Sequence, residues 1–102
     1  MKRVIAFHNT TVGTTGQTLI ELGVNPGDAT ASSNQELEIL LTAESQAIRW
    51  RCDGGAASSS EGQPVAAGNS QTIVGTANVK NLSIAAQTGT ATLQMTIFGG
   101  KA

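Results

Sequence analysis

The chain has 102 residues, a length that corresponds to one domain with a thin hydrophobic core. Only 13% of the residues are charged and the formal net charge is −1, so Thr, Ser, Asn, Gln and Gly must make up most of the surface. The six Lys and Arg residues are scattered, which argues against nucleic-acid binding, because neutralising phosphates requires clustered basic side chains. No apolar run approaches the about 20 residues that span a membrane. The single cysteine excludes an internal disulfide.

Apolar and polar residues alternate over 2–8, which predicts a first strand. A second strand is expected over 17–23, with a short helix as the alternative. Residues 24–35 are rich in Pro, Gly, Ser and Asn and predict a loop. Residues 1–16 could instead form an N-terminal arm of a single β domain that spans the whole chain.

The segments 36–43 and 48–52 predict two further strands, although the leucine spacing in the first also fits a helix. The short polar segment between them predicts a tight turn, and therefore a hairpin over 36–52. In the second strand Trp50 and Cys52 share one face, and the two arginines of that strand lie on the other. We therefore expect Trp50 and Cys52 to face the core and the arginines to face solvent or a neighbouring molecule.

Residues 53–69 form the longest predicted loop, and they are followed by predicted strands over 70–75, 79–86 and 91–98. Gly89 suits a tight hairpin turn between the last two strands. Six or seven short strands with frequent turn residues predict an all-β fold, an antiparallel β-sandwich or a small barrel.

Few residues are suited to catalysis. A catalytic triad would have to use His8, the only histidine, and a zinc site finds no supporting motif. Glu36 and Glu38 share one predicted strand face, but they are expected to pair with Arg49 and Arg51 across the predicted hairpin. The sequence also lacks the glycine motifs that bind phosphates. We therefore predict no enzyme, no cofactor and no metal, and a binding or structural function instead.

The segment 48-IRWRCDGGAASSSEGQPVAAGNSQTIVG-75 resembles short virion proteins encoded among the morphogenesis genes of tailed bacteriophages. In that pattern a strand such as IRWR runs into Asp-Gly, a Ser-rich loop, an apolar pair, Ala-Ala-Gly and a later strand that ends near an aromatic residue. The resemblance covers roughly residues 37–98. The chain departs from it at Cys52, where a second acid is frequent, and at Ala56-Ala57, where Thr-Pro is common.

The resemblance implies a small β-sandwich or barrel that is part of a virion. Among the functions common there, the low-charge, Thr- and Ala-rich composition best suits a capsid decoration (cement) protein that stabilises the head lattice. Its implied partners are the major capsid protein and its own copies, as a homotrimer, with no nucleic acid and no membrane. The expected contact elements are the possible arm and the loops 24–35 and 53–69. Arg49, Arg51 and Asp53 are the candidate contact residues.

Two alternatives remain open: a head–tail or neck adaptor, and a carbohydrate- or receptor-binding β-sandwich module. Saccharide binders usually expose several aromatic side chains, and the three aromatic residues here, Phe7, Trp50 and Phe98, can all belong to the core. The first eleven residues contain too few apolar side chains for a signal peptide. The expected location is therefore the virion, after synthesis in the host cytoplasm.

Overall fold

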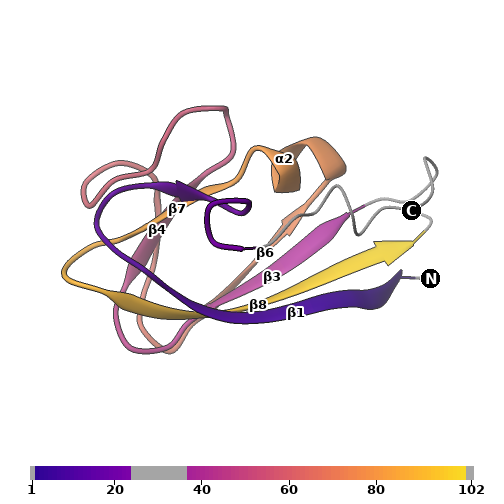
Figure 1. Cartoon of the computed structure of the whole chain (residues 1–102), viewed down its shortest axis with the longest axis horizontal. Coiled ribbons are helices and arrows are strands. Elements are labelled where there is room, and N and C mark those ends of the chain that lie inside the picture. Colours follow the sequence, from indigo (N-terminus) through magenta and orange to yellow (C-terminus); the bar gives the residue numbers. More distant parts are fainter. Residues whose placement is uncertain (1, 24–36, 101–102) are drawn as a thin grey trace.

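The computed structural model describes residues 2–23 and 37–100, which form eight β-strands and one short helix (Figure 1). The elements are β1 (Lys2–Val12), β2 (Gln17–Thr18), β3 (Glu38–Ala43), β4 (Ile48–Arg51), β5 (Gln63–Val65), β6 (Ser70–Val74), α2 (Thr76–Lys80), β7 (Ser83–Ala86) and β8 (Ala91–Gly100). The predicted loop 24–35 lies outside the described residues. Within the described part, no helix has the length and apolar character needed to cross a membrane.

The strands form two antiparallel sheets of four strands each. The first sheet has the order β1-β8-β3-β6, and the second has the order β2-β7-β4-β5. The pairs β1–β8, β2–β7, β3–β6 and β4–β5 are nested, as in one long hairpin that has been rolled up. This is the topology of a jelly roll, and it confirms the predicted all-β sandwich. The described strands number eight rather than six or seven: β5, with three residues inside the predicted loop 53–69, is too short to show in the sequence pattern, and β2 covers only the first two residues of the strand expected over 17–23.

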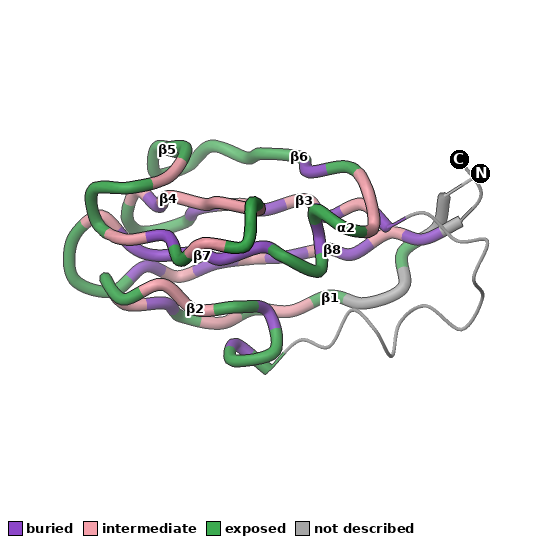
Figure 2. The backbone as a smooth tube through the Cα atoms, turned by 90° about the horizontal axis from the view of Figure 1, so that it is seen from above, coloured by how far each residue is buried: buried purple, intermediate pink, exposed green. Residues whose placement is uncertain are grey.

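The core lies between the two sheets and is built by strict alternation. In β3 and β8 every second side chain points inward and is buried, as the alternating colours along these strands show in Figure 2. The fully buried large side chains are Leu37, Ile39, Leu41, Ile48, Leu82, Ile84, Leu93, Met95, Ile97, Val12 and Val79. Burying one such side chain contributes about 1.5–3 kcal/mol relative to leaving it exposed. The β3–β8 ladder in the middle of the first sheet therefore carries much of the stability.

The predicted hairpin over 36–52 is wrong. β3 pairs with β6 and β8 in the first sheet, whereas β4 pairs with β5 and β7 in the second, so the connection between β3 and β4 crosses from one sheet to the other. Glu38 consequently does not face the arginines of β4 across a ladder. The predicted hairpin at Gly89 is wrong for the same reason, because β7 and β8 belong to different sheets. Alternation specifies which face of a strand is buried, but it does not specify which strand lies beside it.

Parts of two predicted strands form helical turns instead. After β2 the chain turns over residues 19–23, where the Thr18 amide donates to Glu21 Oε1 (2.9 Å) and the Glu21 amide donates to Thr18 Oγ1 (3.2 Å). This reciprocal pair has the arrangement of a helix capping box. The first part of the predicted strand 79–86 belongs to α2, and only its second half is β7.

The segment 1–16, treated above as a possible arm, is mostly a sheet strand, because β1 pairs with β8 along its length. The register of this pair shifts between Val4 and Ala6, which marks a β-bulge. As a result of this extra residue, Val4 and Phe7 lie on the same face of the sheet, which simple alternation would not allow.

The alternation in β3 can be tested with two neighbouring leucines. Leu41 is fully buried, whereas Leu40 is only half-buried on the opposite face. We expect Leu41→Ala to lower the free energy of unfolding by about 2–5 kcal/mol, through lost burial and the cavity that remains. Leu40→Ala should cost clearly less in urea denaturation of dilute protein, and equal costs would contradict the assigned faces.

Candidate functional site

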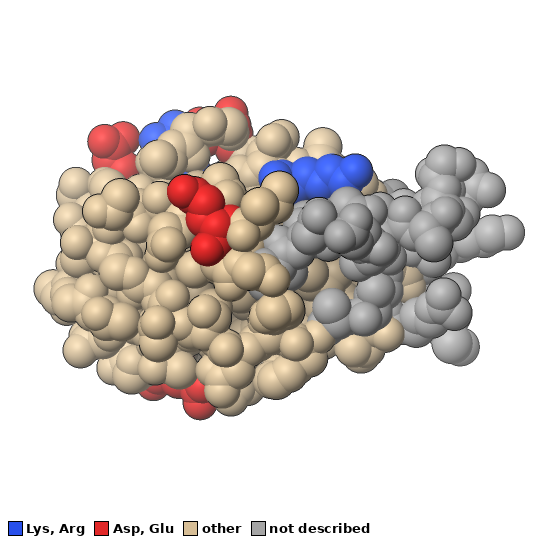
Figure 3. Space-filling view, in the orientation of Figure 1, with Lys and Arg blue, Asp and Glu red and all other residues tan. Residues whose placement is uncertain are grey.

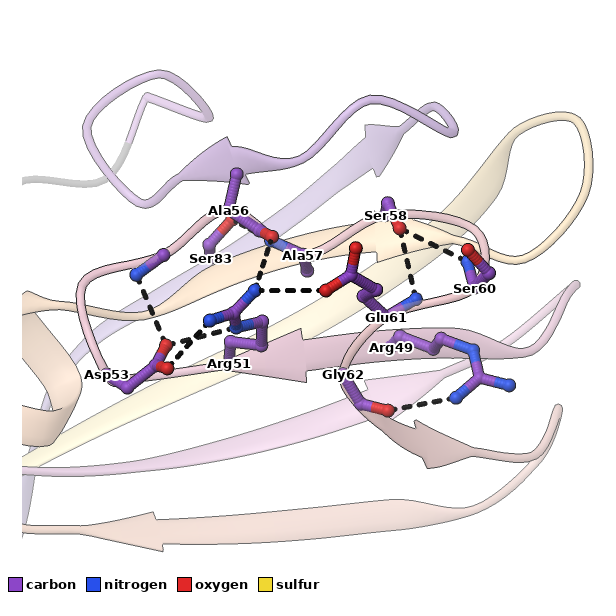
Figure 4. Close-up of polar contacts among 11 residues, drawn as sticks. Arg49, Arg51, Asp53, Ala56, Ala57, Ser58, Ser60, Glu61, Gly62 and Ser83 are labelled. Carbon is purple, nitrogen blue, oxygen red and sulfur yellow. Dashed lines mark hydrogen bonds and ion pairs between the residues drawn. The ribbon is translucent and has the colours of Figure 1, made fainter.

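The predicted contact residues Arg49, Arg51 and Asp53 lie beneath and beside a loop that folds back over the second sheet. We call residues 53–62 the strap. Its Ala57 amide donates a 3.0 Å hydrogen bond to Ser83 Oγ on β7, and both residues are buried. Figure 4 shows the strap lying above the outer side of β4 and β7. The outer face of the second sheet is therefore covered by the chain itself.

Arg51 holds the strap from below. Its Nε and Nη2 donate to the two carboxylate oxygens of Asp53, at 3.0 and 2.7 Å, and its Nη1 donates to the Ala56 carbonyl at 3.3 Å. Glu61, at the far end of the strap, lies 3.6 Å from Nη1 (Figure 4). The hydrogen bond from Arg51, assisted by the Gly55 amide, lowers the pKa of Asp53 to about 2. Bidentate pairing of this kind fixes geometry as well as charge.

Arg49 anchors the end of the strap. Its Nη1 donates to the Gly62 carbonyl at 2.9 Å, while its Nε is buried without a hydrogen-bond partner in the described structure. Gly62 has φ of 126°, and a Cβ atom there would approach the Trp50 carbonyl oxygen to 2.9 Å, so glycine is required. Both arginines thus have intramolecular partners, which strand alternation alone did not reveal. Their predicted contact with a capsid or another partner stays a prediction.

An open depression of about 730 Å³ lies beside the strap, where β4 ends. Its lining includes Trp50, Cys52 and Gln63 from the strand ends and Asn78 from α2. Trp50 and Cys52 also pack against the core, as predicted, although both are only partly buried. The depression therefore combines an aromatic surface with side-chain amides and the carboxylates of Asp53 and Glu61.

The described residues offer no clear centre for metal binding or for histidine chemistry. No group of three or more His, Cys, Asp and Glu side chains within 2–23 and 37–100 is arranged to hold a metal ion. His8 lies within β1, opposite Met95 of β8.

The outer face of the first sheet exposes several large apolar side chains, and we call it the open face. Its apolar side chains lie toward one end of the sheet: Val4 and Phe7 on the edge strand β1 are each 58% exposed, and Val74 on the other edge strand is 53% exposed. Leu40 and Phe98, on the two central strands between them, are half-buried. Val4, Phe7 and Val74 are three of the four large apolar side chains that are exposed in the described part of the chain. The prediction that Phe7 belongs to the core is therefore wrong, and Phe98 also lies on the outer side.

Uncharged hydrogen-bonding residues occupy the rest of the open face. From the pairing register they are Asn9, Thr11, Thr42, Ser70, Thr72, Thr92, Gln94 and Thr96. Glu38 is the only charged side chain among those described on the open face, and it has an interaction partner within the chain. The lack of charge extends around the adjoining edge of the sandwich, where Figure 3 shows mainly uncharged surface and small, separated charged groups. Several apolar side chains exposed on one sheet face, here with Glu38 between Phe98 and Val74, are more typical of a protein-interaction site than of a solvated face.

Comparison of the chain with protein-family models, with curated proteins and with solved structures finds no match.

The Arg51–Asp53 contact predicts an unusual titration. The contact lowers the pKa of Asp53 from 3.8 to about 2. The stabilisation of the strap by this contact is therefore fully present above pH 3.8, and it is lost as the pH falls through about 2. We expect Arg51→Gln to raise the pKa of Asp53 towards 3.8, measured by NMR titration of its carboxyl carbon. Arg49→Gln is the matched control, because Arg49 bonds to Gly62 and not to Asp53. An unchanged pKa in Arg51→Gln would contradict the assigned contact.

Proposed function

We propose that this protein is a structural component of a tailed-bacteriophage virion and serves as a capsid decoration protein. It would bind the major capsid protein and its own copies, and would act mechanically rather than catalytically. Many weak contacts repeated over a symmetric lattice add up to stable attachment. In this way the protein would help the head to withstand the pressure of packaged DNA.

The open face is the observation that carries the proposal. A monomer that remained alone in water would be expected to expose polar residues on the outer side of such a sheet, as half-solvated antiparallel sheets do. Here Val4 and Phe7 are exposed on one edge strand of the face and Val74 on the other, with Leu40 and Phe98 half-buried on the strands between them. Aromatic and apolar residues with little charge are characteristic of the centres of protein interfaces. The jelly-roll fold is used both by viral capsid proteins and by lectins, so the fold by itself supports two candidate functions.

The proposal predicts that the protein is present in purified particles at a high copy number. Quantitative mass spectrometry should give a fixed ratio to the major capsid protein, near one copy per capsid subunit if the whole lattice is decorated. A ratio corresponding to a single ring would favour the neck or tail adaptor instead. Absence from purified particles would refute the virion proposal.

The depression at Trp50 favours the second candidate, a carbohydrate- or receptor-binding module. Its amides from Gln63 and Asn78 beside an indole ring offer the mixed polar and apolar contacts that neutral polar ligands need. The side-chain amide of Gln63 makes no hydrogen bond to another described residue and is available to a ligand, whereas the Asn78 amide already donates to the Val74 carbonyl.

This second function predicts that soluble saccharides change the fluorescence of Trp50, the only tryptophan. Cellobiose and N,N′-diacetylchitobiose would be titrated, with Gln63→Ala expected to weaken any response because Gln63 lines the depression. Gln71→Ala, an exposed glutamine on β6 outside this lining, is the control. No saccharide-dependent change with either sugar would count against this candidate.

A further inference from the structure

We infer that the open face binds a second copy of the same chain, so that two first sheets pack face to face about a two-fold axis. The inference rests on the proposed function, because it names the partner of the surface on which that function was based. The homotrimer implied by the phage resemblance is the competing arrangement.

The two outer faces of the sandwich differ in whether they are already covered. On the second sheet the strap lies over the outer side, fixed by Arg51 and by the buried contact between Ala57 and Ser83. On the first sheet none of the described segments plays this part, and Val4 and Phe7 remain more than half exposed. The protein thus covers the outer face of the second sheet with its own chain and leaves apolar side chains exposed on the first. The face of the first sheet is therefore suited to contact with another molecule.

The edges of the first sheet are less suited to association than its face. On the edge strand β6 the Thr72 carbonyl accepts a bond from Gln71 Nε2 (3.1 Å), and the Val74 carbonyl accepts one from Asn78 Nδ2 (3.0 Å). The other edge strand, β1, contains the bulge between Val4 and Ala6. Bulges and occupied backbone groups are devices that oppose edge-to-edge pairing. Association is therefore expected through side chains of the open face and not by extension of the sheet.

The chemistry of the open face suits an identical partner. Its polar residues are hydroxyls and amides, which both donate and accept hydrogen bonds, so two copies of this surface can satisfy each other. Thr42 and Ser70 already show this, since their hydroxyls share a 2.8 Å hydrogen bond across β3 and β6. Glu38 is the one charged side chain described on the open face, and it has an interaction partner within the chain. Little like-charge repulsion therefore opposes contact between two copies of this face. A strongly charged partner would find little complementary charge among the described side chains of this face.

The area of the open face is sufficient for a weak dimer. Four strands about 4.8 Å apart, with about eight residues of about 3.3 Å each, give a footprint of roughly 19 by 26 Å, or about 500 Å². Two such faces bury about 1,000 Å², which reaches the lower limit for a specific interface but falls short of the usual about 1,600 Å². Sheets pack face to face about 10 Å apart, which leaves room for interdigitating Phe and Val side chains. We therefore expect a reversible dimer with a micromolar dissociation constant.

Sedimentation equilibrium of the full chain, from about 1 to about 500 µM, tests the inference directly. The expected result is a monomer–dimer equilibrium in which Phe7→Lys raises the dissociation constant at least about tenfold, by placing a charge among the apolar side chains of the open face. Ile20→Lys is the matched control: Ile20 is 68% exposed but lies in the turn after β2, away from the open face, so its dissociation constant should change less than about twofold. Circular dichroism of both variants verifies that they are folded.

A second measurement locates the interface without any substitution. In a mixture of isotope-labelled and unlabelled chains, intermolecular NOEs should connect the rings of Phe7 and Phe98 in one copy with the methyl groups of Val4, Leu40 and Val74 in the other. A monomer at every concentration, a trimer mass, or a dimer unaffected by Phe7→Lys would each overturn the inference. These failures are distinct from failure of the virion proposal, which depends on whether purified particles contain the protein.

Discussion

The pairing of β3 with β8 is the contact on which the rest of the structure depends. It joins segments far apart in the sequence and places them in the middle of the first sheet. Their inward residues, such as Leu41 and Met95, are almost completely buried, while their outward residues contribute Leu40 and Phe98 to the open face. Because side chains alternate strictly along a strand, a slip of one residue would move the core side chains to the surface and the surface side chains to the core. The core and the proposed interface are thus specified by the same register.

The second sheet is organised differently, and the difference explains the segment around Arg51. Its strands are shorter, and the strap supplies the cover that a thin sandwich needs on this side. A loop with several serines and glycines has little apolar surface to pack against the sheet. The arginines are required there because their hydrogen bonds fix the strap in place of such packing. Pairing of Arg51 with Asp53 and Glu61 also keeps three of the few charged residues together on one side of the molecule. Among the described side chains, this division leaves Glu38 as the one charge on the outer side of the first sheet.

The sequence was sufficient to predict the fold class, most strands and the inward faces of Trp50 and Cys52, because alternation is a local property. It was not sufficient for strand partners, since a short turn after β3 can lead either to a hairpin or to the opposite sheet. The exposure of Phe7 was hidden by the bulge near Val4, which reverses the alternation at a position that no residue type marks. The partners of Arg49 and Arg51 depend on how the strap folds back, which involves Ser83 far along the chain.

The central claim is that protein covers the open face in the assembled state. Hydroxyl-radical footprinting tests it most directly, by comparing the oxidation of Phe7 and Phe98 in dilute free protein and in purified particles. The account predicts that both rings become protected in particles, while Ile20, which is 68% exposed but lies on another surface, remains reactive. Phe7 oxidised at the same rate in both states would show that the open face stays in contact with water, and would contradict the account.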